Sequence, residues 1–187
     1  MGEPQAKGII LRSSLESIRE LYGAEALGAI VGRLPPAPRD ALRAAVVFTG
    51  NWYPLAWHRT LLATALEVTG RGPKLLRDLA RANIQKDLTT VYRIFLAVAA
   101  PDYVLSRTAR LYSTYFDTGA MAVEERRSGY ARGRCTGCTG FDANVWSYLL
   151  GGSEAVLVAA GARDLKLTVL EGGGDGDSSL RFEGSWR

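Results

Sequence analysis

The chain has only two cysteines, Cys135 and Cys138, and their C-x-x-C spacing is that of a redox pair or of half a zinc site. A thioredoxin-like redox motif follows a strand and opens a helix, but here Thr139 and Gly140 delay the helix that comes next. Structural zinc takes four ligands. The chain has two cysteines and one histidine, so a zinc site would have to be shared between two chains. We favour the simplest interpretation, in which two small residues end a strand and no metal is bound within one chain.

His58 is the only histidine, and the aromatic residues Trp52, Tyr53 and Trp57 lie close to it in the sequence. A catalytic histidine needs a positioned carboxylate or nucleophile, and no Gly-x-Ser-x-Gly or comparable motif supplies one. We therefore expect a packed or surface histidine, no catalytic residues and no enzyme activity. The aromatic residues around it fit either the core or a surface that contacts a partner.

Two polar segments carry weaker chemical signatures. The glycine- and aspartate-rich segment 172–177 lacks the Gly-Lys-Ser/Thr of a phosphate-binding loop and the terminal Glu of an EF-hand, which favours a hairpin turn over a calcium site. Four arginines around Tyr130 could touch phosphates, but Glu124 and Glu125 lie beside them and reduce their field. We interpret this segment as a solvated strand and expect no nucleic-acid binding. The four arginines are Arg126, Arg127, Arg132 and Arg134.

The hydrophobic pattern changes from helical to β along the chain. Apolar residues recur at helical spacing over most of residues 13–117 and alternate with polar residues from about 119 onward. A short strand is expected over 7–11, followed by a helix that starts at Ser13 in a capping-box pattern and ends at Gly23. Residues 51–54 are expected to form a turn, 34–38 a loop and 39–48 a helix.

The second part of the chain predicts a sheet interrupted by one helix. Ser128-Gly129 is typical of a hairpin turn, Asp142 of a helix N-cap, and two further strands flank the segment 172–177. Several helices followed by β-β-α-β-β predict an α+β fold, an N-terminal helical bundle packed on a C-terminal antiparallel sheet. We expect a single domain over 1–187, with a helical part at about 13–117 and a β-rich part at about 119–187.

The composition is that of a soluble globular protein, with 47% hydrophobic and 22% charged residues in a chain of 187. The net charge of +4 is modest, so we give it no weight as a sign of nucleic-acid binding. Residues 1–12 lack a signal-peptide pattern, and no stretch approaches the roughly 18 apolar residues that a membrane span needs. We therefore expect a cytoplasmic protein without a membrane span.

Several segments resemble a haem-NO-binding domain. Lys7-Gly8-Ile9-Ile10 and Ile18-Arg19-Glu20-Leu21-Tyr22-Gly23 are similar to its opening, and Ala80-Arg81-Ala82-Asn83-Ile84 is similar to a mid-helix segment of it. The segment from Gly172 to Trp186 resembles the closing hairpin of 4-vinyl-reductase domains. Nearly the whole chain also resembles a myxobacterial paralogous family of unknown function, through motifs such as Asn51-Trp52-Tyr53-Pro54. Element order connects it to the superfamily that includes TRAPP-like subunits.

The resemblance implies a ligand cavity between helices and sheet, but relatives in this superfamily use it differently. Some hold haem, some sense small organic molecules, and some are trafficking-complex subunits. A haem sensor needs an axial histidine, and here Tyr112 falls near its position. It also needs a Tyr-x-Ser-x-Arg motif, which begins at no tyrosine of this chain. We therefore expect neither haem nor another cofactor.

These considerations predict a non-haem small-molecule sensory or carrier domain that takes part in signalling. A mostly apolar ligand would bind between helices 89–100 and 102–117 and the sheet, where tyrosine hydroxyls could orient it. The alternative is a protein-interaction scaffold without a ligand, working as a homodimer or with another protein partner. In that case the aromatic residues at helical spacing are simply core. The predicted ligand-binding residues are Tyr92, Phe95, Leu111, Tyr112, Tyr115 and Phe116.

Overall fold

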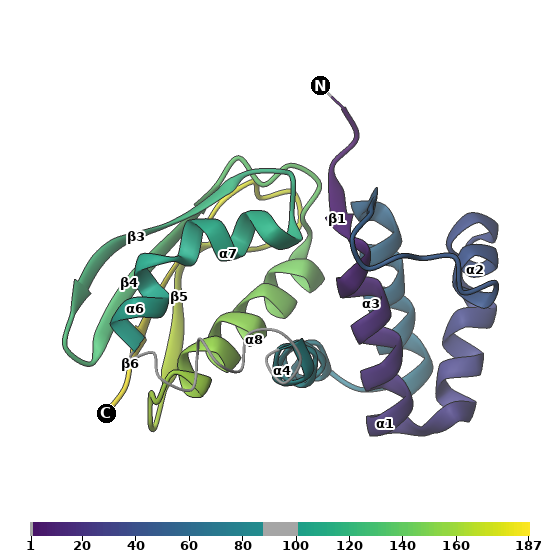
Figure 1. The fold of residues 1–187 in the computed structure, drawn as a ribbon, viewed down its shortest axis with the longest axis horizontal. Coiled ribbons are helices and arrows are strands. Elements are labelled where there is room, and N and C mark those ends of the chain that lie inside the picture. The colour runs from purple at the N-terminus through teal and green to yellow at the C-terminus, as the bar shows by residue number, and fades with distance from the viewer. Residues whose placement is uncertain (1, 88–100) are drawn as a thin grey trace.

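The computed structural model describes residues 2–87 and 101–187, whose elements form a helical part and a sheet part (Figure 1). In the sheet part, four antiparallel strands lie in the order β3-β4-β6-β5. The predicted α+β class, with its β-β-α-β-β order around α8, is confirmed. The elements are β1 (Gln5–Lys7), α1 (Gly8–Arg33), α2 (Pro36–Arg43), β2 (Trp52–Pro54), α3 (Leu55–Thr69), α4 (Lys74–Asp87), α6 (Pro101–Ser106), α7 (Thr108–Tyr115), β3 (Ala120–Arg127), β4 (Tyr130–Thr136), α8 (Ala143–Ala159), β5 (Lys166–Gly172) and β6 (Leu180–Ser185).

Buried and partly exposed residues alternate along the central strands of the sheet, which shows that one face of the sheet packs on the core. Every second residue of β4 and β6 is buried, as expected for strands with one face on the core. Helices α7 and α8 lie over the sheet, with α6 beside β3 and β4 (Figure 1). The buried residues of these two central strands are Ala131, Gly133, Cys135, Leu180, Phe182 and Gly184.

Two of the arginines around Tyr130, Arg132 and Arg134, pair with acidic side chains on the other face of the sheet, whereas Arg126 contacts Asp102 of α6. Arg132 lies 3.0 Å from a carboxylate oxygen of Glu125, and the Tyr130 hydroxyl donates to Glu183 at 2.7 Å. Arg134 lies 3.5 Å from Glu124. Because acidic partners neutralise these side chains, the face does not present an uncompensated basic surface.

Helix α1 begins earlier than the capping-box pattern indicates. It starts at Gly8, because the Gly8 and Ile9 backbone N–H groups donate to the carbonyl oxygens of Asn51 and Thr49 at 2.9 and 3.1 Å. These contacts satisfy two backbone donors of the first helical turn, so the helix can start at Gly8 without a side-chain cap. The prediction of a strand over 7–11 and a helix start at Ser13 was therefore wrong. Gly23, with φ 88°, does interrupt the helix as expected.

Three other segments also differ from the prediction. Residues 52–54, predicted as a turn, form strand β2 and pair with β1. Helix α2 begins at Pro36, inside the predicted loop, because proline is well suited to the first helical position. The helix predicted over 102–117 is divided at Arg107 into α6 and α7. The helix predicted over 89–100 lies outside the described residues.

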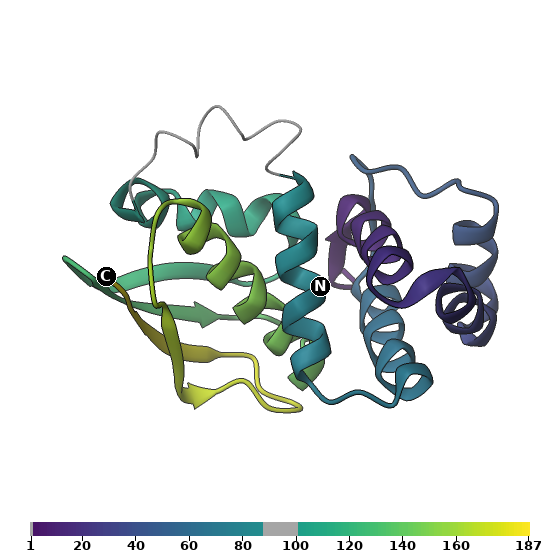
Figure 2. The ribbon, with the colours of Figure 1, turned by 90° about the horizontal axis from the view of Figure 1, so that it is seen from below.

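Helix α4 lies between the helical part and the sheet part (Figure 2) and packs closely on α8. The closest approach is at Gly151, where an added Cβ would lie 2.5 Å from the Arg77 Cα. Beside it, the buried Glu154 carboxylate pairs with Arg77 at 3.1 Å and also with Arg81. This contact joins the two parts of the molecule.

Two predicted local signals are confirmed by the structure. Gly129 turns the β3–β4 hairpin with φ 70°, a conformation that favours glycine. Asp142 caps α8, since its Oδ1 accepts a hydrogen bond from the Val145 backbone N–H at 2.9 Å. Among the described residues, no helix combines the length and the apolar character of a membrane span.

Candidate ligand-binding site

A cavity of about 120 Å³ lies between the inner face of the sheet and the helices that cover it. Helix α6 contributes Val104, α7 contributes Leu111 and α8 contributes Val156. Ile10 of α1 and Ile84 of α4 also line it, so the cavity reaches the boundary between the two parts of the molecule. Its wall is predominantly apolar, with hydroxyl groups among the lining side chains.

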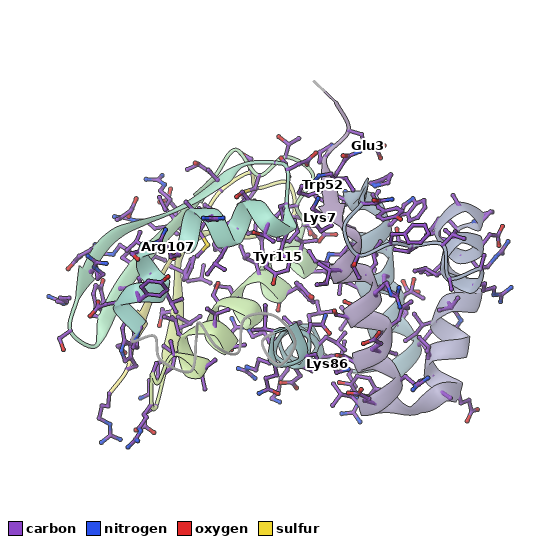
Figure 3. All side chains as sticks on the ribbon, in the orientation of Figure 1. Glu3, Lys7, Trp52, Lys86, Arg107 and Tyr115 are labelled. Carbon is purple, nitrogen blue, oxygen red and sulfur yellow. The ribbon has the colours of Figure 1, made fainter. Side chains whose placement is uncertain are left out.

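The structure brings four of the six predicted site residues together in this wall. Leu111, Tyr112, Tyr115 and Phe116 all line the cavity. Figure 3 places Tyr115 on the side of α7 that faces α8. Tyr92 and Phe95 lie outside the described residues, so their predicted role in ligand binding is not tested. A ligand-binding role for the four residues remains a prediction.

Sequence reasoning placed the sheet beside the ligand but named none of its residues, and it missed the wall contributed by α8. Ala131 and Phe182 line the cavity from β4 and β6, and their period-two alternation was a signal that could have identified them. Gly152 and Val156 line it from α8. A Cβ added at Gly152 would meet only Ile84 Cγ1, at 3.8 Å, so this glycine leaves space unfilled.

Tyr112 connects the cavity to the cysteine pair. Its ring packs against Phe116 with centroids 5.4 Å apart, and its hydroxyl lies 2.7 Å from the Thr118 carbonyl oxygen and 3.2 Å from the Cys138 sulfur. The single hydroxyl proton can be donated either to Thr118, with the Cys138 thiol donating to the phenol oxygen, or to the sulfur itself. Burial, followed by the hydrogen bond with Cys138, raises the pKa of Tyr112 above its usual range.

A second polar group closes the cavity near α1 and α4. Tyr148, which lines the cavity, hydrogen-bonds to the side-chain amide of Asn83 at 2.6 Å. With the amide oriented to satisfy both of its ends, Asn83 accepts from Tyr148 and Ser14 and donates to Ser17 at 2.6 Å. A buried amide with this many partners is a rigid part of the structure.

His58 is fully buried behind Tyr148 and is not part of the cavity wall formed by the described residues. The two rings meet edge to face, with centroids 4.7 Å apart. Neither ring nitrogen of His58 has a hydrogen-bond partner within residues 2–87 and 101–187. Burial lowers the pKa of His58 to about 3, so the ring is neutral near pH 7. The expectation of a packed histidine is consistent with this position.

The cysteine pair lies at the end of β4, as its sequence position predicted. Both thiols are buried and neither is in a disulfide. Helix α8 begins only at Ala143, so the motif does not open a helix as a thioredoxin site would. In the part of the chain that the structure describes, no group of three or more His, Cys, Asp or Glu side chains could hold a metal ion.

Solved structures show the fold to which this arrangement belongs. No family model matches the chain, and no curated protein matches it in sequence. A variant of the Fe(II) unliganded H-NOX protein from K. algicida superposes with a TM-score of 0.74 at 14% identity, covering 97% of this chain and 96% of that one. An oxygen-binding H-NOX domain related to soluble guanylate cyclases, solved as its oxygen complex, gives 0.68 at 16% identity, covering 97% and 95%.

These similarities support the haem-NO-binding resemblance at the level of fold. They do not address the 4-vinyl-reductase, TRAPP-like or myxobacterial resemblances, which remain predictions. The chain has the H-NOX fold over nearly its whole length.

Proposed function

We propose that the chain is a non-haem sensory or carrier domain that binds a small, mostly apolar molecule in the cavity between α7, α8 and the sheet. The observation that carries this proposal is the cavity itself, which holds four of the residues selected for ligand binding from the sequence. The H-NOX neighbours support it further, because the one related to soluble guanylate cyclases is described as binding oxygen.

The dimensions of the cavity indicate the class of ligand. An apolar protein cavity of roughly 150 Å³ is large enough to bind benzene or xenon, whereas pockets for larger ligands hold about 300–1,000 Å³. The cavity of about 120 Å³ therefore suits a molecule of about one ring. Tyr115 and Thr108 could supply the few polar contacts that orient such a ligand.

The residues around the cavity do not fit a haem. A volume of about 120 Å³ is small for a porphyrin. Tyr112, near the expected axial position, would have to ligate iron as a tyrosinate, yet its raised pKa disfavours that form. His58 lies behind Tyr148, outside the described wall. These features support a site whose ligand is not a metalloporphyrin.

The alternative scaffold function has weaker support. It relies on exposed aromatic residues near Trp52 and Trp57, but Tyr53 and Trp57 pack against each other and against the core, with centroids 5.5 Å apart. The Tyr53 hydroxyl also accepts from the Phe48 backbone N–H at 2.8 Å. Half-buried aromatic residues with structural contacts offer little free apolar surface to a partner.

Native mass spectrometry of gently purified protein tests the proposal. We expect a bound mass far below that of haem, or saturable uptake of a one-ring aromatic such as benzene by ligand-free protein. Titration with haemin should give no stoichiometric Soret band of a ligated haem. A stable one-to-one haem complex would overturn the non-haem assignment, and a protein that binds none of these molecules would overturn the ligand-binding function.

A further inference from the structure

Three groups that can donate a hydrogen bond come together at the sulfur of Cys138, although the single proton of the Tyr112 hydroxyl can go either to this sulfur or to the Thr118 carbonyl oxygen. The Tyr112 hydroxyl is 3.2 Å away, the Cys135 thiol is hydrogen-bonded to it, and the backbone N–H of Ala120 at the start of β3 also points to it. Gly119 makes this approach feasible, since a Cβ there would lie 2.6 Å from the sulfur. The β3–β4 pairing thus brings the start of β3 against this sulfur.

Convergent donors stabilise a thiolate, which is the reactive form of cysteine. The hydrogen bond from Cys135 is the largest influence and lowers the pKa of Cys138 to about 7, against the opposing effect of burial. Tyr112 and the Ala120 backbone act in the same direction. The pKa of Cys135 is raised, first by its hydrogen bond to Cys138 and then by burial. The two thiols are therefore unequal: one ionises near neutral pH and the other stays protonated.

The backbone holds the two sulfurs at a tight turn. Gly137, between them, has φ 67°, and the Cys138 backbone N–H is fixed to the Ser178 carbonyl oxygen at 2.9 Å. Cys138 contributes to the wall of a polar cleft with Arg59 and Asp142, which form an ion pair at 3.0 Å. Both sulfurs are buried, so the cleft suits a small oxidant better than a bulky one.

We propose that Cys138 and Cys135 are a redox-modification site, with Cys138 as the attacking thiolate, and that a hydroperoxide converts them into a reversible disulfide. The Cys138 thiolate attacks the O–O bond of hydrogen peroxide, which forms an S–O bond and releases hydroxide. The Cys135 thiol then attacks that sulfur, the S–S bond forms, and water leaves with the Cys135 proton. The sulfurs lose two electrons in total, peroxide is reduced to two waters, and a dithiol reductant returns two electrons and two protons.

Oxidation would change the surroundings of the ligand cavity. A disulfide sulfur is a poor acceptor and carries no proton, so Tyr112 keeps only its hydrogen bond to Thr118. Because Tyr112 lines the cavity, the thiol state and the occupancy of the cavity become coupled. This coupling rests on the proposed ligand-binding function, whereas disulfide formation itself does not.

The experiment is a thiol-trapping mass measurement on the full chain, without any ligand. After treatment with hydrogen peroxide, the wild-type chain should lose both free thiols, become roughly 2 Da lighter and recover with a dithiol. The Cys135→Ser variant should stop at a sulfenic acid on Cys138 that dimedone captures. The Cys138→Ser variant should consume peroxide at least about tenfold more slowly, because the activated thiolate is gone and burial still raises the pKa of the remaining Cys135 thiol.

Tyr112→Phe provides a readout that a purely structural role would not affect. Without the hydroxyl donor, the pH at which peroxide reactivity is half-maximal should rise above its wild-type value near 7. The proposal is overturned if folded wild-type protein keeps both thiols under conditions that oxidise the unfolded chain, or if Cys138 is over-oxidised without a disulfide. If a serine variant fails to fold, the wild-type measurement still decides. The thiol experiment contains no ligand. A negative result would therefore overturn the redox proposal without affecting the proposed ligand-binding function, which native mass spectrometry tests.

Discussion

Tyr112 lies 3.2 Å from the sulfur of Cys138 and also lines the apolar cavity. One side chain thus contributes its ring to the candidate ligand site and its hydroxyl to the cysteine pair. The sequence resemblance predicts the axial-ligand position of a haem sensor near this tyrosine, whose hydroxyl is engaged here with Thr118 and Cys138.

The Tyr112→Phe variant should be destabilised by about 1–2 kcal/mol, because it leaves the Thr118 carbonyl oxygen without its hydrogen bond while preserving the ring. Urea unfolding monitored by circular dichroism measures this change. A matched control is Tyr103→Phe, since the Tyr103 side chain is exposed and should leave stability within about 0.5 kcal/mol. Equal stability of Tyr112→Phe and wild type would contradict the buried hydrogen bond.

Adjacent glycines in α8 should respond oppositely to the same substitution. Gly151→Ala places a Cβ 2.5 Å from the Arg77 Cα and should cost about 1–3 kcal/mol through overpacking against α4. Gly152→Ala meets nothing closer than 3.8 Å and should gain up to about 1 kcal/mol from helix propensity. Thermal unfolding of both variants checks the α4–α8 packing, and a neutral Gly151→Ala would show that the helices are less close.

Stability should fall on acidification through His58. Its pKa is about 3 in the folded chain and about 6.5 when unfolded, so between these values the unfolded state binds the extra proton. The folded state therefore has its full stability above pH 6.5 and loses it as pH falls toward 3, by about 3 kcal/mol at pH 4.5. This loss should be absent in His58→Leu, which removes the titrating ring.

The measurement is urea unfolding of wild type and His58→Leu at pH 7.5 and pH 4.5. Acidic groups also titrate in this range, so the difference between the two proteins, rather than the wild-type slope, reports on His58. If the two proteins lose stability in parallel between these pH values, the buried neutral histidine is contradicted.

Local signals in the sequence predicted much of the fold. Gly129 at the hairpin and Asp142 at the start of α8 act through contacts with near neighbours, so their residue types suffice. The start of α1 at Gly8 depends on the carbonyl groups of Asn51 and Thr49, and the pattern around Ser13 contains no information about them. The strand at 52–54 was missed for the same reason, since its partner is β1.

Among the described residues, the sequence identified site residues on α7 but none on α8 or on the strands. Leu111 and Tyr115 recur at helical spacing, and this periodicity identified one wall of the cavity. Alternation along β6 could place Phe182 on the inner face of the sheet, but its position in the cavity wall also depends on the register in which β6 pairs with β4. The contact between Tyr112 and Cys138 likewise depends on how α7 packs on the sheet. The sequence alone therefore does not connect the tyrosine with the cysteine pair.

The most direct test of the account compares two identical substitutions on α8. Val156 lines the cavity, whereas Val158 is 54% exposed on the same helix, so Val156→Phe fills the site and Val158→Phe is its matched control. Benzene affinity, measured by NMR titration, should fall at least about tenfold in Val156→Phe and remain unchanged in Val158→Phe. Wild-type affinity in Val156→Phe, or no binding by the wild-type chain, would contradict a ligand site between α7, α8 and the sheet.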